Sequence, residues 1–327
     1  MAVTEDPWLA WPDEALERRG RPPQRPDRWY RRRELHLAAG ILVAVLTVIF
    51  AGDRAAAGAR ATLDGRLVQA GAGADAALVA VESEQLSAVR AVAFTQGVPQ
   101  ALAAHDGPKL TTLVTPLQAN STVPMIDVVL PDGKVLLAVR SKGAPAPVAS
   151  RKGLRALGQA LRTAHGVRGG RLSEIVIYRS GPTLLTISPI VIGTTPVGAV
   201  LAMTPLADVL GRLSQEVGVD LTAYDAIGDP IATSASFTPK KIDADTAQTL
   251  MGGGAIVTRY VYADHREKLG RLIIDHQPDA VLGVSLEDDS NVTGRMTSIY
   301  AALGILCTVI LLASFWARVV LARRRQW

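Results

Sequence analysis

Two uninterrupted apolar runs, one near each end, are the strongest constraint on how this chain can fold. The first covers residues 37–52 and the second residues 299–317, and neither contains a charged residue. A helix rises about 1.5 Å per residue, so the second run spans roughly 28 Å, close to the hydrocarbon thickness of a bilayer. The first run is shorter, but the aromatic residues and arginines before it suit the headgroup region. We therefore predict transmembrane helices over residues 35–53 and 299–318.

Two alternatives compete with this interpretation. A core helix of a soluble protein normally carries a polar stripe, which both runs lack. For the first run, a cleaved signal peptide is the sharper alternative, because small residues follow it at positions 55–59. However, residues 1–36 are too long and too mixed in charge for the usual start of such a peptide. We favour an uncleaved membrane anchor.

The distribution of charge predicts the orientation in the membrane. The segment before the first run contains eight arginines and seven acidic residues, and four arginines follow the second run. The whole net charge of +5 therefore lies on the two ends, and the middle of the chain is neutral. Since positive flanks stay in the cytoplasm, we expect both termini there and the central domain outside the plasma (inner) membrane. This explains the basic excess without a nucleic-acid partner.

The predicted cytoplasmic tail, residues 1–34, is rich in proline and alternating charge and is expected to be disordered. Trp8 and Trp11 precede a helix-start signal in which Pro12 is followed by acidic residues. One interpretation is a short helix that rests on the membrane surface. The other makes Trp8 and Trp11 a docking peptide for a cytoplasmic partner.

The middle of the chain predicts an α+β fold. Residues 54–105 have helical periodicity and are expected to form one long helix that continues from the first span. Residues 106–205 then read as two strands, a helix over residues 151–163 and three strands, and residues 206–298 repeat that order in shorter form. The predicted architecture is thus two antiparallel-sheet modules on a long N-terminal helix, between two transmembrane helices and a short cytoplasmic tail at residues 319–327.

Four segments of these modules resemble the double Cache family of PAS-like sensor domains, and the resemblance covers about residues 54–298. They are the hairpin DVVLPDGK (residues 127–134), LLTISPI (184–190), VGAVL (197–201) and YDAIGDPIATS (224–234). The resemblance implies an extracytoplasmic sensor whose membrane-distal module, residues 106–205, holds a small molecule between the sheet and the helical side. Such sensors usually continue into an output domain, which we do not find after residue 318. The resemblance therefore implies a separate signalling partner, such as a kinase, a cyclase or a chemoreceptor-like protein.

Motifs for chemistry are missing from the sequence. The five histidines have no second histidine or cysteine at a ligand spacing, and the one cysteine, Cys307, lies within the second apolar run. We find no nucleophile elbow, phosphate loop or dinucleotide fingerprint. We therefore expect neither an enzyme nor a metal or other cofactor.

Polar residues on otherwise apolar strands are the candidates for ligand binding: Asp127, Arg140, Tyr178, Arg179 and Thr186. Asp127 shares a strand face with Met125 and Val129, since side chains alternate along a strand. A carboxylate buried there needs either an internal arginine or a ligand amine as its partner. The alternative is that Asp127 faces solvent at the edge of the sheet. Alternation puts Tyr178 on one face of its strand and Arg179 on the other.

We predict a bacterial, membrane-anchored small-molecule sensor. Bacterial origin is indicated by a composition rich in alanine, glycine, valine and arginine. The expected partners are membrane lipid, an unknown ligand, a separate signalling protein and a second copy of the chain in a homodimer. The alternative is a scaffold or assembly protein that binds another protein of the cell envelope.

Overall fold

The computed structural model describes residues 28–145, 150–164, 172–262, 265–288 and 290–324. They fall into two compact units, which are described separately. One is the folded domain, residues 59–289, and the other contains both chain ends, residues 1–58 and 290–327.

The unit of the chain ends contains the two predicted membrane segments, each in a helix. The first apolar run lies in α2 (Arg28–Ala93) and the second in α8 (Ser290–Arg324). One described helix, Ala39–Ala93, has a stretch long and apolar enough to cross a membrane, whereas the described apolar part of α8, Ala302–Ser314, is shorter. The second span therefore stays a prediction. Residues 28–34 are helical rather than part of the predicted disordered tail.

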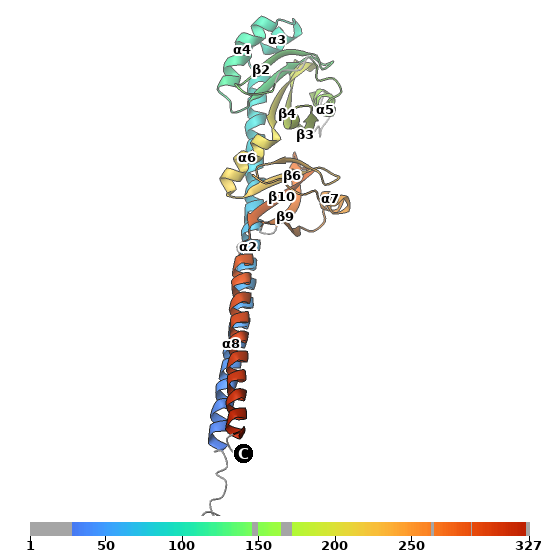
Figure 1. Cartoon of the computed structure of the whole chain (residues 1–327). Helices are drawn as coiled ribbons and strands as arrows, with labels where there is room; N and C mark the ends of the chain where they lie inside the picture. Colours follow the sequence, from blue (N-terminus) through green and yellow to red (C-terminus); the bar gives the residue numbers. More distant parts are fainter. Residues whose placement is uncertain (1–27, 146–149, 165–171, 263–264, 289, 325–327) are drawn as a thin grey trace, which may run out of the picture. The chain divides into compact units, whose positions relative to one another are not determined.

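Residues 59–93 of α2 run along both halves of the folded domain (Figure 1). This part of the helix contributes buried residues to both halves. Leu67, Leu78 and Val81 pack in one apolar core, and Val89 and Val92 pack in the next. These spacings are multiples of helical turns, so a single face of the helix is buried throughout.

The first module is a five-stranded antiparallel sheet in the order β2-β1-β5-β4-β3. One face packs on α2, α3 and α4, and the other on α5. Its elements are α3 (Val98–Ala103), α4 (Gly107–Ala119), β1 (Met125–Val129), β2 (Val135–Arg140), α5 (Arg155–Ala164), β3 (Ser173–Tyr178), β4 (Gly181–Ile192) and β5 (Thr195–Pro205).

The second module repeats this plan, with the strand order β7-β6-β10-β9-β8. Each strand has a counterpart five numbers earlier, and α7 occupies the position of α5 between the second and third strands. The predicted repeat of element order is therefore confirmed. Its elements are α6 (Leu206–Val217), β6 (Asp220–Tyr224), β7 (Pro230–Thr233), α7 (Ala244–Met251), β8 (Val257–Tyr262), β9 (His265–Ile274) and β10 (Gln277–Glu287).

Two helix predictions differ from the structure. The helix expected over residues 54–105 is continuous only to Ala93, and α3 starts after Gly97, whose φ of 92° lies in the left-handed region. Helix α4 was not predicted, although Asp106 caps it by accepting a hydrogen bond from the Lys109 N–H. The helix expected over residues 151–163 begins only at Arg155.

The two modules are joined by hydrogen bonds at the turn between β9 and β10. The Asp275 carboxylate accepts from the backbone N–H groups of Leu172 (2.5 Å) and Ser173 (3.4 Å), at the start of β3. The Asp279 carboxylate accepts from the Ile175 N–H (2.9 Å). Glu82 of α2 in turn accepts from the Asp275 N–H (3.0 Å). Edge strand β3 of the first module is thus held by carboxylates of the second.

We expect Asp275→Gly to loosen this junction. Glycine suits the left-handed backbone of Asp275 (φ 46°) but provides no acceptor. Hydrogen bonds to charged groups contribute about 1.5–3 kcal/mol, so amide exchange at residues 172–173 should quicken about tenfold or more in hydrogen–deuterium exchange of the full chain. Asp275→Asn, which keeps both a carbonyl acceptor and tolerance of this backbone, is the matched control. Equal exchange in the glycine variant and the wild type would contradict the assigned role.

Candidate functional site

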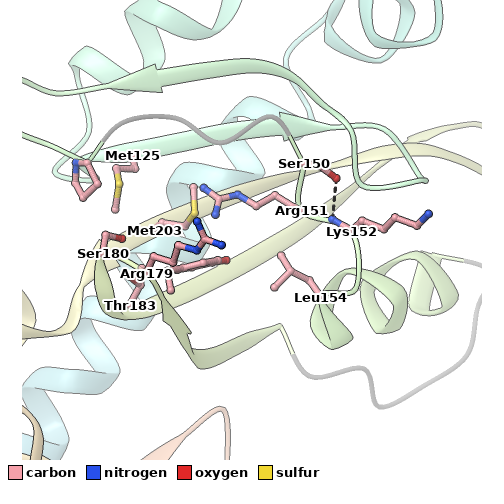
Figure 2. A pocket seen from close by; sticks show the side chains of 11 residues that line it. Met125, Ser150, Arg151, Lys152, Leu154, Arg179, Ser180, Thr183 and Met203 are labelled. Atoms are coloured by element: carbon pink, nitrogen blue, oxygen red, sulfur yellow. Dashed lines mark hydrogen bonds between the residues drawn. The ribbon is translucent and has the colours of Figure 1, made fainter.

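The first module contains a cavity of about 460 Å³ on the α5 side of its sheet. The cavity lies among the ends of β1, β4 and β5, the end of β3, and the segment that leads into α5 (Figure 2). Its volume is in the range of small-molecule sites. The described residues that line it are Met125, Pro145, Ser150, Arg151, Lys152, Leu154, Tyr178, Arg179, Ser180, Thr183 and Met203.

Local pairing with the β1–β2 turn places Arg151 at this cavity. The Arg151 N–H donates to the Gly133 carbonyl oxygen at 2.6 Å. Gly133 has a φ of +85°, and a Cβ there would lie 2.8 Å from the Lys152 backbone, so only glycine allows this close approach. The predicted Pro131–Gly133 turn therefore also positions a residue of the site.

A buried carboxylate with two arginines lies beside the cavity. Asp127 is fully buried, and its Oδ1 is 2.5 Å from Arg140 Nη2. Its Oδ2 accepts from Arg151 Nε at 2.8 Å and is 2.7 Å from Arg151 Nη2. Of the two partners that the sequence left open for Asp127, the structure provides internal arginines.

Tyr178 completes this wall of the cavity. The Arg151 guanidinium lies over its ring, 4.7 Å from the ring centre, within cation–π range. Burial raises the pKa of the Tyr178 hydroxyl above its ordinary value, and the charge of Arg151 opposes that shift. The phenol therefore stays protonated at neutral pH and can donate a hydrogen bond.

The predicted site residues do not all lie at the cavity. Tyr178 and Arg179 line it, while Asp127 and Arg140 lie beside it and reach it through Arg151. Alternation put Arg179 on the opposite face from Tyr178, but β3 ends at Tyr178, and Arg179 follows in a turn where alternation no longer holds.

Thr186 lies away from the cavity in a buried polar network. Its hydroxyl donates to the Gln85 side-chain oxygen of α2 (2.8 Å) and lies 3.0 Å from the Ser173 hydroxyl. Gln85 also donates to the Thr204 hydroxyl (2.8 Å). Thr186 thus links the sheet to α2 in this structure. The predicted docking residues Trp8 and Trp11 are outside the described residues.

Sequence reasoning missed Arg151 and the apolar residues Met125, Leu154 and Met203. Arg151 was assigned to a helix, where nothing marks it as a partner of Asp127. Its pairing depends on a contact across 24 positions of sequence, and no local pattern shows it. Within the described residues, no group of three or more histidine, cysteine, aspartate or glutamate side chains could hold a metal ion.

The corresponding side of the second module carries a buried cluster of polar side chains. The Tyr224 hydroxyl donates to Glu267 Oε1 (2.8 Å), and Arg259 donates to both Glu267 Oε2 (2.7 Å) and the Tyr224 oxygen (3.0 Å). Burial raises the pKa of Glu267, and burial together with the Glu267 charge raises that of Tyr224. A Cβ at Gly283 would lie 2.9 Å from the Tyr224 ring, so this triad packs directly against β10.

Comparison with known proteins gives structural neighbours but no sequence family. No family model and no curated protein matches the chain. One neighbour is the extracellular domain of vpHK1S-Z8, a candidate histidine kinase, with a TM-score of 0.49 and 13% identity over 73% of this chain and 97% of that one. The sensor domain of the Vibrio cholerae histidine kinase DctB has a TM-score of 0.46 and 8% identity, over 69% and 96%. The ligand-binding domain of the Campylobacter jejuni chemoreceptor Tlp3, in complex with L-valine, has a TM-score of 0.45 and 13% identity, over 71% of this chain and 94% of that one.

The three neighbours are an extracellular domain, a sensor domain and a ligand-binding domain. The two-module architecture on a long helix is the one expected of a double Cache domain.

We expect Asp127→Asn to destabilise the first module. The substitution leaves the guanidiniums of Arg140 and Arg151 buried without a counter-charge, and breaking a buried ion pair on one side costs about 3–5 kcal/mol. Thermal unfolding of the full chain in detergent, followed by circular dichroism, measures the loss. Asp132→Asn, at the exposed turn nearby, is the control and should change little. Equal unfolding temperatures for the two variants would contradict this account.

Proposed function

We propose that this chain is a membrane-anchored extracytoplasmic sensor. In this proposal the first module binds a small molecule, and a conformational signal passes to a separate signalling protein. The observation that carries the proposal is the difference between two otherwise matching modules. One has a cavity of about 460 Å³ with polar and apolar walls, whereas on the corresponding side of the other Tyr224, Arg259 and Glu267 are hydrogen-bonded to one another.

The contacts of β3 support a route for the signal. Tyr178, the last residue of this strand, lines the cavity, and its first residue, Ser173, together with the preceding Leu172, donates to Asp275. Asp275 is in the turn that leads into β10, and β10 is followed along the chain by α8. A ligand that shifts the end of β3 would therefore act on the second module through the Asp275 hydrogen bonds.

Membrane anchoring and orientation are part of the proposal. The apolar stretch of α2 and the charge of the chain ends support a plasma (inner) membrane protein with both termini in the cytoplasm. We propose α8 as the second span and membrane lipid as the surroundings of both helices. The signalling partner, a kinase, cyclase or chemoreceptor-like protein, would be reached through these helices or through Trp8 and Trp11.

A homodimer is supported by exposed apolar side chains on α2. Val68 and Val79 are 49% and 61% exposed on the helix that builds both cores. Small residues between them would let a second copy of the helix approach closely. In this arrangement a shift of α2 in one copy would also displace α2 of the other copy.

We expect at least one compound of a metabolite panel to raise the unfolding temperature of the full chain in detergent. A ligand at about 100 times its Kd adds about 2.7 kcal/mol of stability. Residues 59–289 contain no tryptophan, so circular dichroism is the suitable probe. Ser180→Trp, at the exposed edge of the cavity, should abolish the shift, and Thr111→Trp on α4 should keep it. No shift with any compound, together with a stoichiometric envelope partner on purification, would favour the scaffold alternative.

Cysteine labelling tests the proposed orientation. In a Cys307→Ser background, which removes the only cysteine of the chain, Lys142→Cys introduces an exposed thiol in the first module. A membrane-impermeant maleimide should label this variant in cells whose inner membrane is intact. Labelling that requires lysis of that membrane would place the domain on the cytoplasmic side and overturn the orientation.

A further inference from the structure

We infer that the cavity of the first module binds an organic anion, with the acidic group of the ligand near Arg151 and Arg179 and its apolar part against Met125 and Met203. We also infer that the cavity has no subsite for a ligand ammonium group. This inference rests on the proposed function and narrows it to one class of ligand.

The cavity wall carries a positive charge. Arg151, Lys152 and Arg179 line the cavity, and none of its described lining residues is acidic. Two carboxylates lie nearby: Asp127 faces the guanidiniums of Arg140 and Arg151, and Glu174 is close enough for its charge to act on the Tyr178 hydroxyl. Arg179 has no ion pair within the part of the chain that the structure describes, and with Arg140, Arg151 and Lys152 it makes four cations against these two carboxylates.

The three cationic side chains of the lining differ in how well they can contact an acidic group of the ligand. Figure 2 shows the guanidinium ends of Arg151 and Arg179 in the same region as Met203, whereas Lys152 extends away from them. Arg151 is fixed by Asp127 and by the Tyr178 ring. Arg179 is exposed and able to adjust to a ligand. A planar guanidinium matches the geometry of a carboxylate, so this pair is suited to an acidic group.

An α-amino acid would also bring an ammonium group into the cavity. Such a group needs a carboxylate or several carbonyl oxygens, and the carboxylates close to the cavity are Asp127 and Glu174. Glu174 already accepts a hydrogen bond from the Ala156 N–H. Both Asp127 oxygens already lie within 2.8 Å of guanidinium nitrogens, and the residue is fully buried. A ligand ammonium would have to displace an arginine or lose its hydration beside uncompensated positive charge, and both are unfavourable.

The remaining wall of the cavity is largely apolar and can pack against a hydrocarbon part of the ligand. Met125, Met203 and Leu154 form the apolar part of the lining, and the thioether side chains adapt to ligands of different shape. Tyr178 and Thr183 add hydroxyl groups to the lining. This arrangement fits a carboxylate with a short hydrocarbon chain better than a purely polar anion.

Calorimetric titration of the full chain in detergent at neutral pH tests the ligand class with four probes that share one hydrocarbon chain. They are hexanoate, hexan-1-ol, hexylamine and norleucine. We expect hexanoate to bind below about 10 mM, and norleucine to bind about tenfold more weakly, because only its added ammonium differs. Hexanol and hexylamine should give no saturable heat. Absence of hexanoate binding, or tighter binding of norleucine or hexylamine, would overturn the inference.

A matched pair of variants locates the bound anion. Arg179→Gln removes the unpaired cation of the cavity and should weaken hexanoate binding about tenfold or more. Arg155→Gln removes an exposed arginine of α5 that does not line the cavity, and it should leave the affinity unchanged. Equal affinities in the two variants would overturn the assignment.

The two proposals fail in different ways. Saturable binding of hexylamine or norleucine alone, lost in Ser180→Trp, would overturn the anion class and keep the sensor. Failure of every compound in the wider panel would overturn the sensor itself.

Discussion

Both halves of the folded domain depend on burial of one stripe along α2. The helix supplies Leu67, Leu78 and Val81 to one core and Val89 and Val92 to the next, so neither core is complete without it. A fully buried leucine or valine contributes about 1.5–3 kcal/mol, and these side chains together outweigh any single polar contact in the domain. Because one rigid helix is shared, a displacement of it in either module is a displacement in both. Gln85 and Glu82 add polar contacts at the level where the modules meet.

The ion cluster at Asp127 has a different role from the apolar stripe. Burying a carboxylate with two guanidiniums gains little net stability, because desolvation offsets most of the attraction. The cluster instead fixes the positions of two arginines. Arg140 and Arg151 come from different segments, and Asp127 holds both beside the same cavity. The same atoms also decide what the cavity can accept, since a carboxylate already engaged by arginine offers nothing to a cationic ligand.

Much of the fold could be predicted from the sequence, and less of the site. Alternating apolar residues and turn signals such as Pro131–Gly133 located the strands, and the order of elements exposed the repeat. The face of Asp127 followed from the same alternation. Arg151 and Arg179 lie outside regular structure, where periodicity says nothing about direction. The Tyr224, Arg259 and Glu267 triad joins three strands, so only the tertiary structure could show that these side chains meet.

The turn between β9 and β10 has a consequence for how the domain could change shape. Its two central residues, Asp275 and His276, have φ values of 46° and 62°, although two-residue hairpins of this kind favour glycine. A left-handed backbone without glycine costs of order 1–3 kcal/mol for a residue, less for aspartate and histidine. The hydrogen bonds that Asp275 makes with Leu172, Ser173 and Glu82 help to hold this backbone in place. Loss of those bonds would leave the turn with fewer contacts, so the conformation of this hairpin depends on both sheets.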